Sequence, residues 1–587
     1  MIMMAYSLCL IVRRERYKSP AKTQARIRRI VERTLRDSPH VLINTATGRL
    51  RDRAQRASAF ESMPIFNELV SSMTTSIDRA RIRREVQEHF QYVILSHKWE
   101  NNEPLFQEVI HMAVYDLDPS STHDKLQMFC KIAQEAGFKW AWSDTCCIDT
   151  GKHDVHQEAL VAMFKWYSGS ALMIVFLRGV SSSSQLGDLA KSIWNTRGWT
   201  LQEYIAAKVI RFYTEDWTPY LNLTLPNHKE SPEVTSEMEQ ATGVSSQQLM
   251  ALRPGLRSIR EKLRLASTRR TERVEDAAYS LLGIFSVTGI PAIYGEGEAA
   301  LGRLLSHILA GSGDVSILAW TGESGSFNSC LPAHISVFNG PATSHLPSPI
   351  PDAEMERIVT ASYTPSFNLA VALQLYDRLR ELPPPWFAAS RMKLPCIAVQ
   401  LPPLSSSRTR SGRVQVYRVD TVTFGTVEIK TRQDLSRMES LYLVHPWLDT
   451  LLEHEHGPGG ASVEEDVLRA PSPRGDDDES DEECDDDDDD DGQEISDDDS
   501  EDYHSVSSEP STHSVLVPMA ADRETRARQL VARLRQPFGA LLVSLASTGR
   551  RAPDYRRVAA DSLITVQFRE DVSLDEILEN VRTLDVL

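Results

Sequence analysis

The chain has 587 residues, 41% of them hydrophobic, and a formal net charge of −18 at pH 7. A chain of this length exceeds what one hydrophobic core supports, so we expect two to four domains. The sequence contains no run of about 18 apolar residues, the pattern typical of a membrane-spanning helix, and we therefore expect no membrane span.

The acidic bias of the chain is local. Residues 476–502 contain 20 acidic residues and no basic one. Without this segment the chain has 62 acidic and 64 basic residues, a net charge of +2. A near-neutral body gives no indication of binding to nucleic acid or to an anionic membrane, so neither is expected among the partners.

The cysteines and the first residues of the chain indicate a cellular compartment. Seven cysteines, odd in number and irregularly spaced, argue against a disulfide framework and for a reducing environment. The first twelve residues are apolar, but the basic cluster RRERYK follows them, whereas in a secretory signal basic residues come first. We expect a cytoplasmic protein.

Residues 1–90 are expected to form a helical and basic N-terminal segment. It includes the helical stretch TQARIRRIVERTLRD (23–37) and a short apolar segment, HVLINTATGRL (40–50), that suits a hairpin or a turn. Residues 91–225 then alternate between strand-like runs, which begin at residues 92, 139, 171 and 208, and stretches with helical apolar spacing. This alternation predicts an α/β domain with a parallel sheet flanked by helices.

Further regions follow this domain. We expect a helical extension at 226–315, a β-rich accessory domain at 316–453, a disordered acidic insertion at 454–514 and the completion of the accessory domain at 515–587. The segments interpreted as short strands or a final helix are SILAW (316–320), PCIAVQL (395–401), VQVYRV (414–419), VTFGTVEI (422–429), GALLVSLAS (539–547), DSLITVQF (561–568) and the helix SLDEILENVRTL (573–584).

Five sequence blocks stand out in a fixed order. They are YVILSHKWE (92–100), KWAWSDTCCIDTGKHDVHQEA (139–159), RGWTLQEY (197–204), RVEDAAYSLLGIF (273–285) and IYGEGEAALGRLL (293–305). Together these blocks resemble the fungal heterokaryon-incompatibility (HET) domain. The resemblance spans roughly residues 40–340, and the C-terminal part resembles that of basidiomycete relatives. HET domains are regarded as remote relatives of Toll/interleukin-1 receptor (TIR) domains, so the resemblance implies a TIR-like sheet.

Glu203 is the candidate catalytic residue. Some TIR domains cleave NAD with a glutamate a few residues after a tryptophan, and Trp199 and Glu203 occupy comparable places. Residues four apart share a helix face, so Trp199 can line a cleft into which Glu203 points. A carboxylate there can stabilise the cation that forms when a glycosidic bond breaks. The structural alternative is that Glu203 caps the helix or pairs with Arg197 on its surface.

The candidate ligand-binding residues follow the expected strands. Ligands bind outside the carboxyl ends of strands in such sheets. A loop with serine and histidine can hold a phosphate or a ribose, although Trp99 could instead pack on the sheet. His97 and Lys98 depart from the SYVWG pattern usual in the family. The candidates are Ser96, His97, Trp99, Asp144, Asp149, Arg197 and Trp199.

A metal site is not expected. Cys130, Cys146, Cys147, His153 and His156 are adjacent or irregularly spaced, and no CxxC pair is present, so buried small side chains are the better interpretation of the cysteines. The sequence also lacks a GxxxxGK[ST] phosphate loop. We assign no cofactor, and NAD enters only as a candidate substrate.

Two functional classes remain open. The resemblance implies an effector of non-self recognition that leads to growth arrest or regulated cell death. Such an effector is either an enzyme that cleaves NAD or a related nucleotide through Glu203, or a non-enzymatic module that acts by homotypic or partner assembly. No sensor module is evident, so we expect activation by a protein partner or by self-association. In the acidic segment, Ser480, Ser496 and Ser500 suit an acidophilic kinase, and the segment itself suits a basic partner or a solvated spacer.

Overall fold

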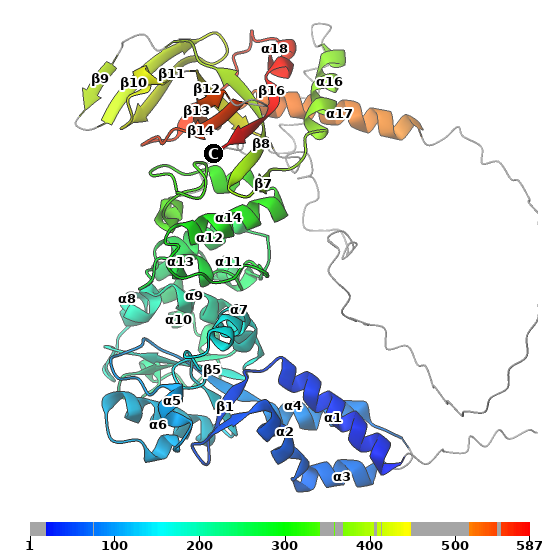
Figure 1. Ribbon diagram of the computed structural model, residues 1–587, viewed down its shortest axis with the longest axis vertical. Helices are drawn as coiled ribbons and strands as arrows, with labels where there is room; N and C mark the ends of the chain where they lie inside the picture. The colour runs from blue at the N-terminus through cyan, green and yellow to red at the C-terminus, as the bar shows by residue number, and fades with distance from the viewer. Residues whose placement is uncertain are drawn as a thin grey trace, which may run out of the picture.

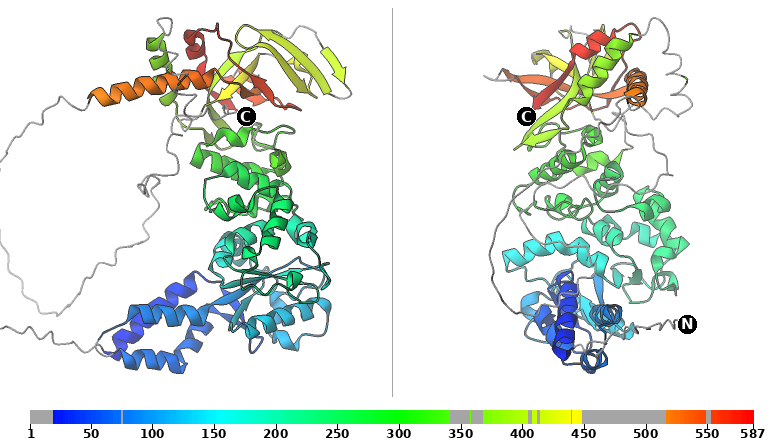
Figure 2. Two further views of the ribbon diagram at one scale, coloured as in Figure 1. Left: turned by 180° about the vertical axis from the view of Figure 1, so that it is seen from behind. Right: turned by 90° about the vertical axis from the view of Figure 1, so that its right-hand side faces the viewer.

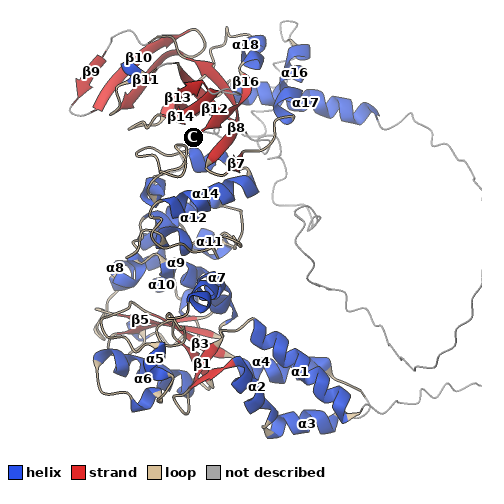
Figure 3. Cartoon of the chain, viewed as in Figure 1, coloured by secondary structure: helices blue, strands red, loops and turns tan. Residues whose placement is uncertain are grey.

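The computed structural model describes residues 19–73, 76–340, 357, 368–403, 408–411, 414–438, 440–447, 516–548 and 553–587. The predictions for residues 1–18 and for the acidic insertion lie outside these residues. Figure 3 shows helices next to a central sheet, a helical region beyond it and a β-rich region that contains the C-terminal residues. Within the described ranges, no helix is both long and apolar enough to cross a membrane.

Four N-terminal helices form a small core of their own. Thr23, Ile27, Val31 and Leu35 repeat at helical spacing and are buried against the neighbouring helices. Ser19 caps the first helix by accepting a hydrogen bond from the Lys22 amide. The helices project from one edge of the central sheet (Figure 1) and are α1 (Pro20–Arg36), α2 (Arg53–Glu61), α3 (Pro64–Ser72) and α4 (Arg79–Phe90).

The central sheet has six strands in the order β2-β1-β4-β3-β5-β6. Four of them pair in parallel, which confirms the predicted α/β sheet. Strands β3 and β5 are buried along their whole length, as expected where helices cover both faces. The parallel strands are β3 (Tyr92–Ser96), β4 (Trp140–Trp142), β5 (Leu172–Leu177) and β6 (Ile210–Thr214).

The sheet is mixed, because the predicted parallel pairing does not extend to one edge. Strands β1 (Val41–Asn44) and β2 (Leu50–Asp52) form a hairpin, and β1 pairs antiparallel with β4, with Ile43 beside Ala141. The sequence indicated a hairpin here but not its membership of the sheet. Strands of four and three residues are too short for their pattern to identify the partner strand.

Helices cover both faces of the sheet. Figure 1 shows α5 and α6 on one side and α7 and α9 on the other. The chain leaves β3 for β4 on one side and later returns to β5 on the opposite side of β3. Such a reversal of strand order marks the point where α/β sheets bind ligands. The helices are α5 (Phe106–Val109), α6 (Ser121–Glu135), α7 (His153–Gly169), α8 (Asp188–Lys191) and α9 (Trp199–Ala206).

The predicted helical extension packs on the sheet domain and shares its hydrophobic core. Gly283 brings this region close to α7, since a Cβ atom there would lie 2.2 Å from the Phe164 Cβ. The glycine is therefore needed for close packing. The helices are α10 (Pro232–Thr242), α11 (Ser246–Ala251), α12 (Ile259–Ser267), α13 (Asp276–Tyr279) and α14 (Ala299–Ser312).

The C-terminal region is β-rich, as predicted. Strands on both sides of the acidic segment pair with each other, and five of them close into a ring in the order β8-β12-β13-β14-β16. A separate sheet contains β9, β10 and β11. The strands are β7 (Trp386–Ala388), β8 (Arg391–Gln400), β9 (Arg408–Ser411), β10 (Val414–Thr421), β11 (Gly425–Thr431), β12 (Leu441–Pro446), β13 (Phe538–Thr548), β14 (Pro553–Arg557), β15 (Ile564–Val566) and β16 (Val581–Val586).

Two expectations for this region were wrong. SILAW is not a strand: residues 315–318 form a 3-10 turn, and the Asp314 side chain caps it by accepting a hydrogen bond from the Ser316 amide at 2.9 Å. The final helix is shorter than predicted, since α18 ends at Glu579 and the chain continues as β16 against β8. The remaining helices are α16 (Leu369–Arg380), α17 (Leu516–Leu534) and α18 (Leu574–Glu579).

Buried Arg557 joins the β-rich region to the helical region. Its guanidinium donates hydrogen bonds to the backbone oxygens of Leu318 (3.0 Å) and Trp320 (2.6 Å) and lies 3.7 Å from the centre of the Trp320 ring. Asn328 adds a hydrogen bond of 2.9 Å to the Val586 oxygen. The sheet domain, the helical region and the β-rich region therefore follow one another along the molecule, as both views of Figure 2 show.

Candidate functional site

The carboxyl ends of β3 and β4 bring several predicted site residues to one edge of the sheet. Ile94 lies beside Trp142 in the parallel register, which places Ser96 level with Asp144. Ser96 is the last residue of β3, at the point where the strand order reverses. The predicted position of the site, at the loops after these strands, is therefore the position where sheets of this kind bind ligands.

Glu203 contacts this edge from α9. It is 5% exposed, and its Oε2 accepts a short hydrogen bond from the Ser96 hydroxyl. Trp194 Nε1 in turn donates to the Ser96 oxygen at 2.7 Å. Glu203 is thus a buried residue bonded to the end of the central strand, so the alternative that placed it on a helix surface was wrong.

The protonation of this site is set by burial. Burial raises the pKa of Glu203 to about 7, against the Ser96 hydrogen bond and the charge of Arg197, which both lower it. Burial also raises the pKa of Asp144 to about 6, opposed by the Trp99 hydrogen bond and again by Arg197. A carboxyl group that titrates near neutral pH can both accept and donate a proton there.

Arg197 is held between the sheet edge and the helical region. Its guanidinium donates a short hydrogen bond to the His97 backbone oxygen. Arg269 donates to the Arg197 backbone oxygen at 3.0 Å and to the Thr200 hydroxyl at 2.8 Å. Gly198 allows this close contact, because a Cβ atom there would lie 2.5 Å from the Thr271 methyl carbon. Residues of the helical region therefore position the start of α9.

Trp99 forms the outer part of the site. Its side chain is 38% exposed, and its Nε1 donates to Asp144 Oδ2 at 2.8 Å. The indole therefore stays at the surface while it orients a carboxyl group beside the buried cluster. This position differs from the alternative in which Trp99 packs onto the sheet.

Buried polar atoms without a hydrogen-bond partner lie at the same edge. His97 is 4% exposed and neither of its ring nitrogens has a hydrogen-bond partner, and Asp144 Oδ1 also has none. Burial, together with the charges of Lys125 and Arg197, holds the pKa of His97 well below its ordinary value, so its ring is neutral. Most buried polar atoms are hydrogen-bonded, so these atoms are suited to receive groups of a ligand.

A buried charge pair supports the loop after β3. Lys125 on α6 forms a short ion pair with Glu103 and lies 3.6 Å from Glu100, and Glu103 Oε1 lies 3.7 Å from His97 Nε2. The sequence interpretation missed Lys125 and Glu103. The sequence does contain an indication that Lys125 is buried: it lies four residues before Phe129 and therefore shares the buried face of the helix.

Two predicted ligand residues lie outside this cluster. Asp149 Oδ1 accepts hydrogen bonds from Gln107 Nε2 (2.8 Å) and from the Gly151 amide (3.2 Å), so it shapes the loop after β4. Trp199 lies beside the Asp276 side chain in the helical region, where its interaction opposes the burial that raises the pKa of Asp276. The structure therefore brings together Ser96, His97, Trp99, Asp144, Arg197 and Glu203, and it places Asp149 and Trp199 with other partners.

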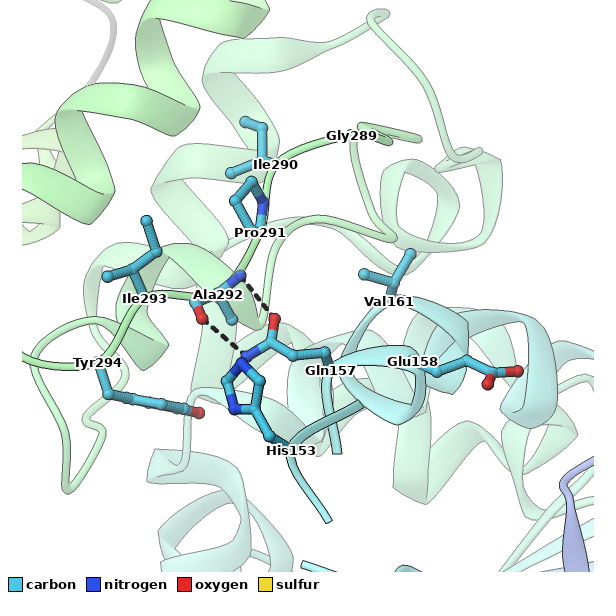
Figure 4. Close-up of a pocket in the computed structure, with 10 residues that line it drawn as sticks. All are labelled: His153, Gln157, Glu158, Val161, Gly289, Ile290, Pro291, Ala292, Ile293 and Tyr294. Carbon is cyan, nitrogen blue, oxygen red and sulfur yellow. Dashed lines mark hydrogen bonds between the residues drawn. The ribbon is translucent and has the colours of Figure 1, made fainter. Parts of the chain in front are cut away.

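A pocket with a volume of about 780 Å³ lies apart from these residues, between α7 and residues 289–294 (Figure 4). Gln157 fixes its wall, because its side-chain amide donates to the Ala292 oxygen at 2.7 Å and accepts from the Ala292 amide at 2.9 Å. Its lining is mostly apolar and includes no residue of the Glu203 cluster, so we place the candidate chemistry at the sheet edge.

The five cysteines among the described residues are buried and free. Cys130, Cys146, Cys147, Cys330 and Cys396 form no disulfide, and burial raises the pKa of the Cys130 and Cys396 thiols above the ordinary value. These positions confirm the interpretation of these five cysteines as small buried side chains. Within the described part of the chain, no group of three or more His, Cys, Asp or Glu side chains is placed to hold a metal ion.

Comparisons with known proteins point to one family. Residues 92–191, which include β3, β4 and β5, match the family described as heterokaryon incompatibility protein (HET). The chain is 34% identical over 228 residues to vegetative incompatibility protein HET-E-1 of Podospora anserina, a match that covers 37% of this chain and 16% of that protein. The chain thus spans about a sixth of this curated relative. No solved structure matches the chain.

Proposed function

We propose that this chain, a fungal HET-domain protein, acts as an effector in vegetative incompatibility that leads to growth arrest or regulated cell death. The proposal is supported by the similarity to HET-E-1, whose name states a role in vegetative incompatibility. It also includes a TIR-like relationship of the sheet domain, supported by the parallel order β4-β3-β5-β6, and a cytoplasmic location.

The chemistry we propose is cleavage of NAD or a related nucleotide at the bond between nicotinamide and ribose. The observation that carries it is the buried Ser96–Glu203 pair at the reversal of strand order, at the same sheet edge as Asp144 and His97, which have side-chain atoms without a hydrogen-bond partner. A nucleotide carries ribose hydroxyls and phosphates, which suit a carboxylate acceptor, a neutral histidine and an arginine in one site.

The proposed reaction assigns a role to each of these groups. The C–N glycosidic bond breaks, and nicotinamide leaves with the electron pair of that bond. Glu203 stabilises the positive charge that develops on the ribose. Water then adds to the ribose carbon and loses one proton, for which the Glu203 carboxylate is the acceptor. Asp144 binds a ribose hydroxyl, and Arg197 faces a phosphate.

Burial of Glu203 explains why the effector requires activation. At 5% exposure the carboxyl group is not accessible to a ribose in the described conformation. The loop that carries Trp99, whose indole is 38% exposed, covers the outer side of the cluster and holds Asp144. We propose that self-association or a protein partner moves this loop, which gives the nucleotide access to Glu203.

Expression of variants in fungal cells tests the proposal. Glu203→Gln keeps the size and a hydrogen-bond acceptor for Ser96 but removes the charge. Glu237→Gln is a matched control. Glu237 lies on α10, away from α9, is 2% exposed and accepts a hydrogen bond from the Tyr220 hydroxyl at 2.8 Å. We expect growth arrest and NAD depletion with the wild type and with Glu237→Gln, and neither effect with Glu203→Gln.

A second candidate function is assembly without catalysis. The observation that favours it is that Glu203 is buried and its Oε2 accepts a hydrogen bond from Ser96, which is also what a structural carboxyl group requires. In that case the domain signals by contact with copies of itself or with a partner. Growth arrest by Glu203→Gln at unchanged cellular NAD would support assembly and overturn nucleotide cleavage.

A further inference from the structure

Helix α1 carries a continuous basic face. Lys22, Arg26, Arg29, Arg33 and Arg36 follow one another at intervals of four, three, four and three residues, so their side chains form one stripe along the helix. The buried stripe of Thr23, Ile27, Val31 and Leu35 occupies the other side of α1 and packs on the neighbouring helices. The basic face is therefore directed away from the core.

The basic face has few acidic partners among the described residues. Lys22, Arg29, Arg33 and Arg36 are exposed, and no ion pair seen in the described ranges involves any of these four. Arg28, on a different side of α1, does pair with Glu61 at 2.8 Å. The helix contains six basic residues and a single acidic one, Glu32. Such a face attracts an anionic partner.

The chain itself contains a segment of the complementary charge. Residues 476–502 carry 20 acidic residues and no basic residue. The 28 residues between Trp447 and Asp476 can span up to about 95 Å when extended, so the tether is long. A tethered segment has an effective concentration of about a millimolar, which favours binding within one chain even when each ion pair contributes little.

We propose that the basic face of α1 binds the acidic segment 476–502 of the same chain. The face is about 21 Å long from Lys22 to Arg36 at the helical rise, which is shorter than the extended segment. Different stretches of the segment can therefore bind the basic face in turn, and the affinity depends on the total negative charge of the segment. Phosphorylation of Ser480, Ser496 or Ser500 adds negative charge and strengthens the contact.

Peptide binding to full-length chains tests this proposal. The probe is a fluorescent peptide of residues 476–502, and binding is followed by fluorescence anisotropy at low salt. In one variant all Asp and Glu of that segment are replaced by Asn and Gln, which removes the internal competitor. We expect this neutralised chain to bind the peptide at least tenfold more tightly than the wild type does. We also expect a loss of at least tenfold between about 50 and 300 mM salt.

A second set of variants locates the binding face. In the neutralised chain, Arg29→Glu with Arg33→Glu and Arg36→Glu should weaken peptide binding at least tenfold. The control reverses Arg378, Arg432 and Arg437, whose side chains are 54%, 69% and 87% exposed in the β-rich region, and should leave binding within about twofold. Circular dichroism checks that both sets remain folded.

Four results would overturn the proposal. The wild type and the neutralised chain could bind the peptide equally, which would show that the internal segment does not compete. The α1 variant could bind as well as its control, which would place the contact elsewhere. A DNA duplex of similar charge could bind the wild type at α1 as tightly as it binds the neutralised chain, which would identify nucleic acid as the partner. Dimers of the wild type that dissociate at high salt would show that the acidic segment binds α1 of a second copy of the chain.

Discussion

Two buried charged groups in this molecule differ in how completely they are satisfied. Arg557, at the junction of the helical and β-rich regions, donates to the backbone oxygens of Leu318 and Trp320 and lies against the Trp320 ring. Glu203, at the sheet edge, is close enough to Asp144 for the two charges to interact, and Asp144 Oδ1 has no hydrogen-bond partner. A buried charge with its hydrogen bonds made stabilises one packing arrangement. A buried cluster that contains polar atoms without hydrogen-bond partners is instead suited to bind a ligand.

At the sheet edge, the largest expected loss of stability is that of Lys125→Met. Lys125 and Glu103 are both buried, so removal of the cation leaves an unpaired carboxylate beside His97. We expect a loss of about 3 to 5 kcal/mol in the free energy of unfolding, measured by denaturant titration. The double variant with Glu103→Leu should recover most of that loss. A double variant that is as unstable as Lys125→Met would show that the pair is not the cause.

Arg557→Met tests the contribution of the hydrogen-bonded buried charge at the junction of the helical and β-rich regions. The change leaves buried backbone oxygens without a donor, and each such oxygen costs about 1 to 3 kcal/mol. We expect a loss of about 3 kcal/mol in the free energy of unfolding of the β-rich region. Arg556→Ala is the matched control, because this neighbouring residue is exposed, and it should change stability by less than about 0.5 kcal/mol. Similar losses in both variants would remove the special role of Arg557.

The pH dependence of stability tests the burial of Glu203 with a smaller effect. Burial raises the pKa of Glu203 to about 7 in the folded state, so on raising the pH the unfolded chain loses this proton first. Stability therefore falls as the pH rises from about 4.5 through 7. From pH 5 to pH 8 the wild type should lose roughly 2 to 3 kcal/mol more than Glu203→Gln does. Parallel pH curves for the two proteins would mean that Glu203 is not perturbed in the folded state.

The sequence was sufficient where the signal is local. The four parallel strands follow from short apolar runs, and Ser96 and Glu203 were both identified as site residues. It was insufficient where the contact is distant: the Ser96–Glu203 hydrogen bond joins residues 107 positions apart, and nothing in a single sequence fixes it. Lys125 was missed because a lysine in an amphipathic helix normally lies on the polar side. SILAW is so short that the spacing of its apolar residues does not distinguish a strand from a buried 3-10 turn.

Nicotinamide release by the purified full-length protein tests the central claim most directly. The wild type, Glu203→Gln and Glu237→Gln are incubated with NAD over a range of protein concentrations that promotes self-association, and nicotinamide is quantified by chromatography. We predict release by the wild type and by Glu237→Gln, increasing with protein concentration, and a loss of at least a hundredfold in Glu203→Gln. Equal release by Glu203→Gln, or none from a folded and self-associated wild type, would contradict the assignment of the sheet edge as a nucleotide-cleaving site.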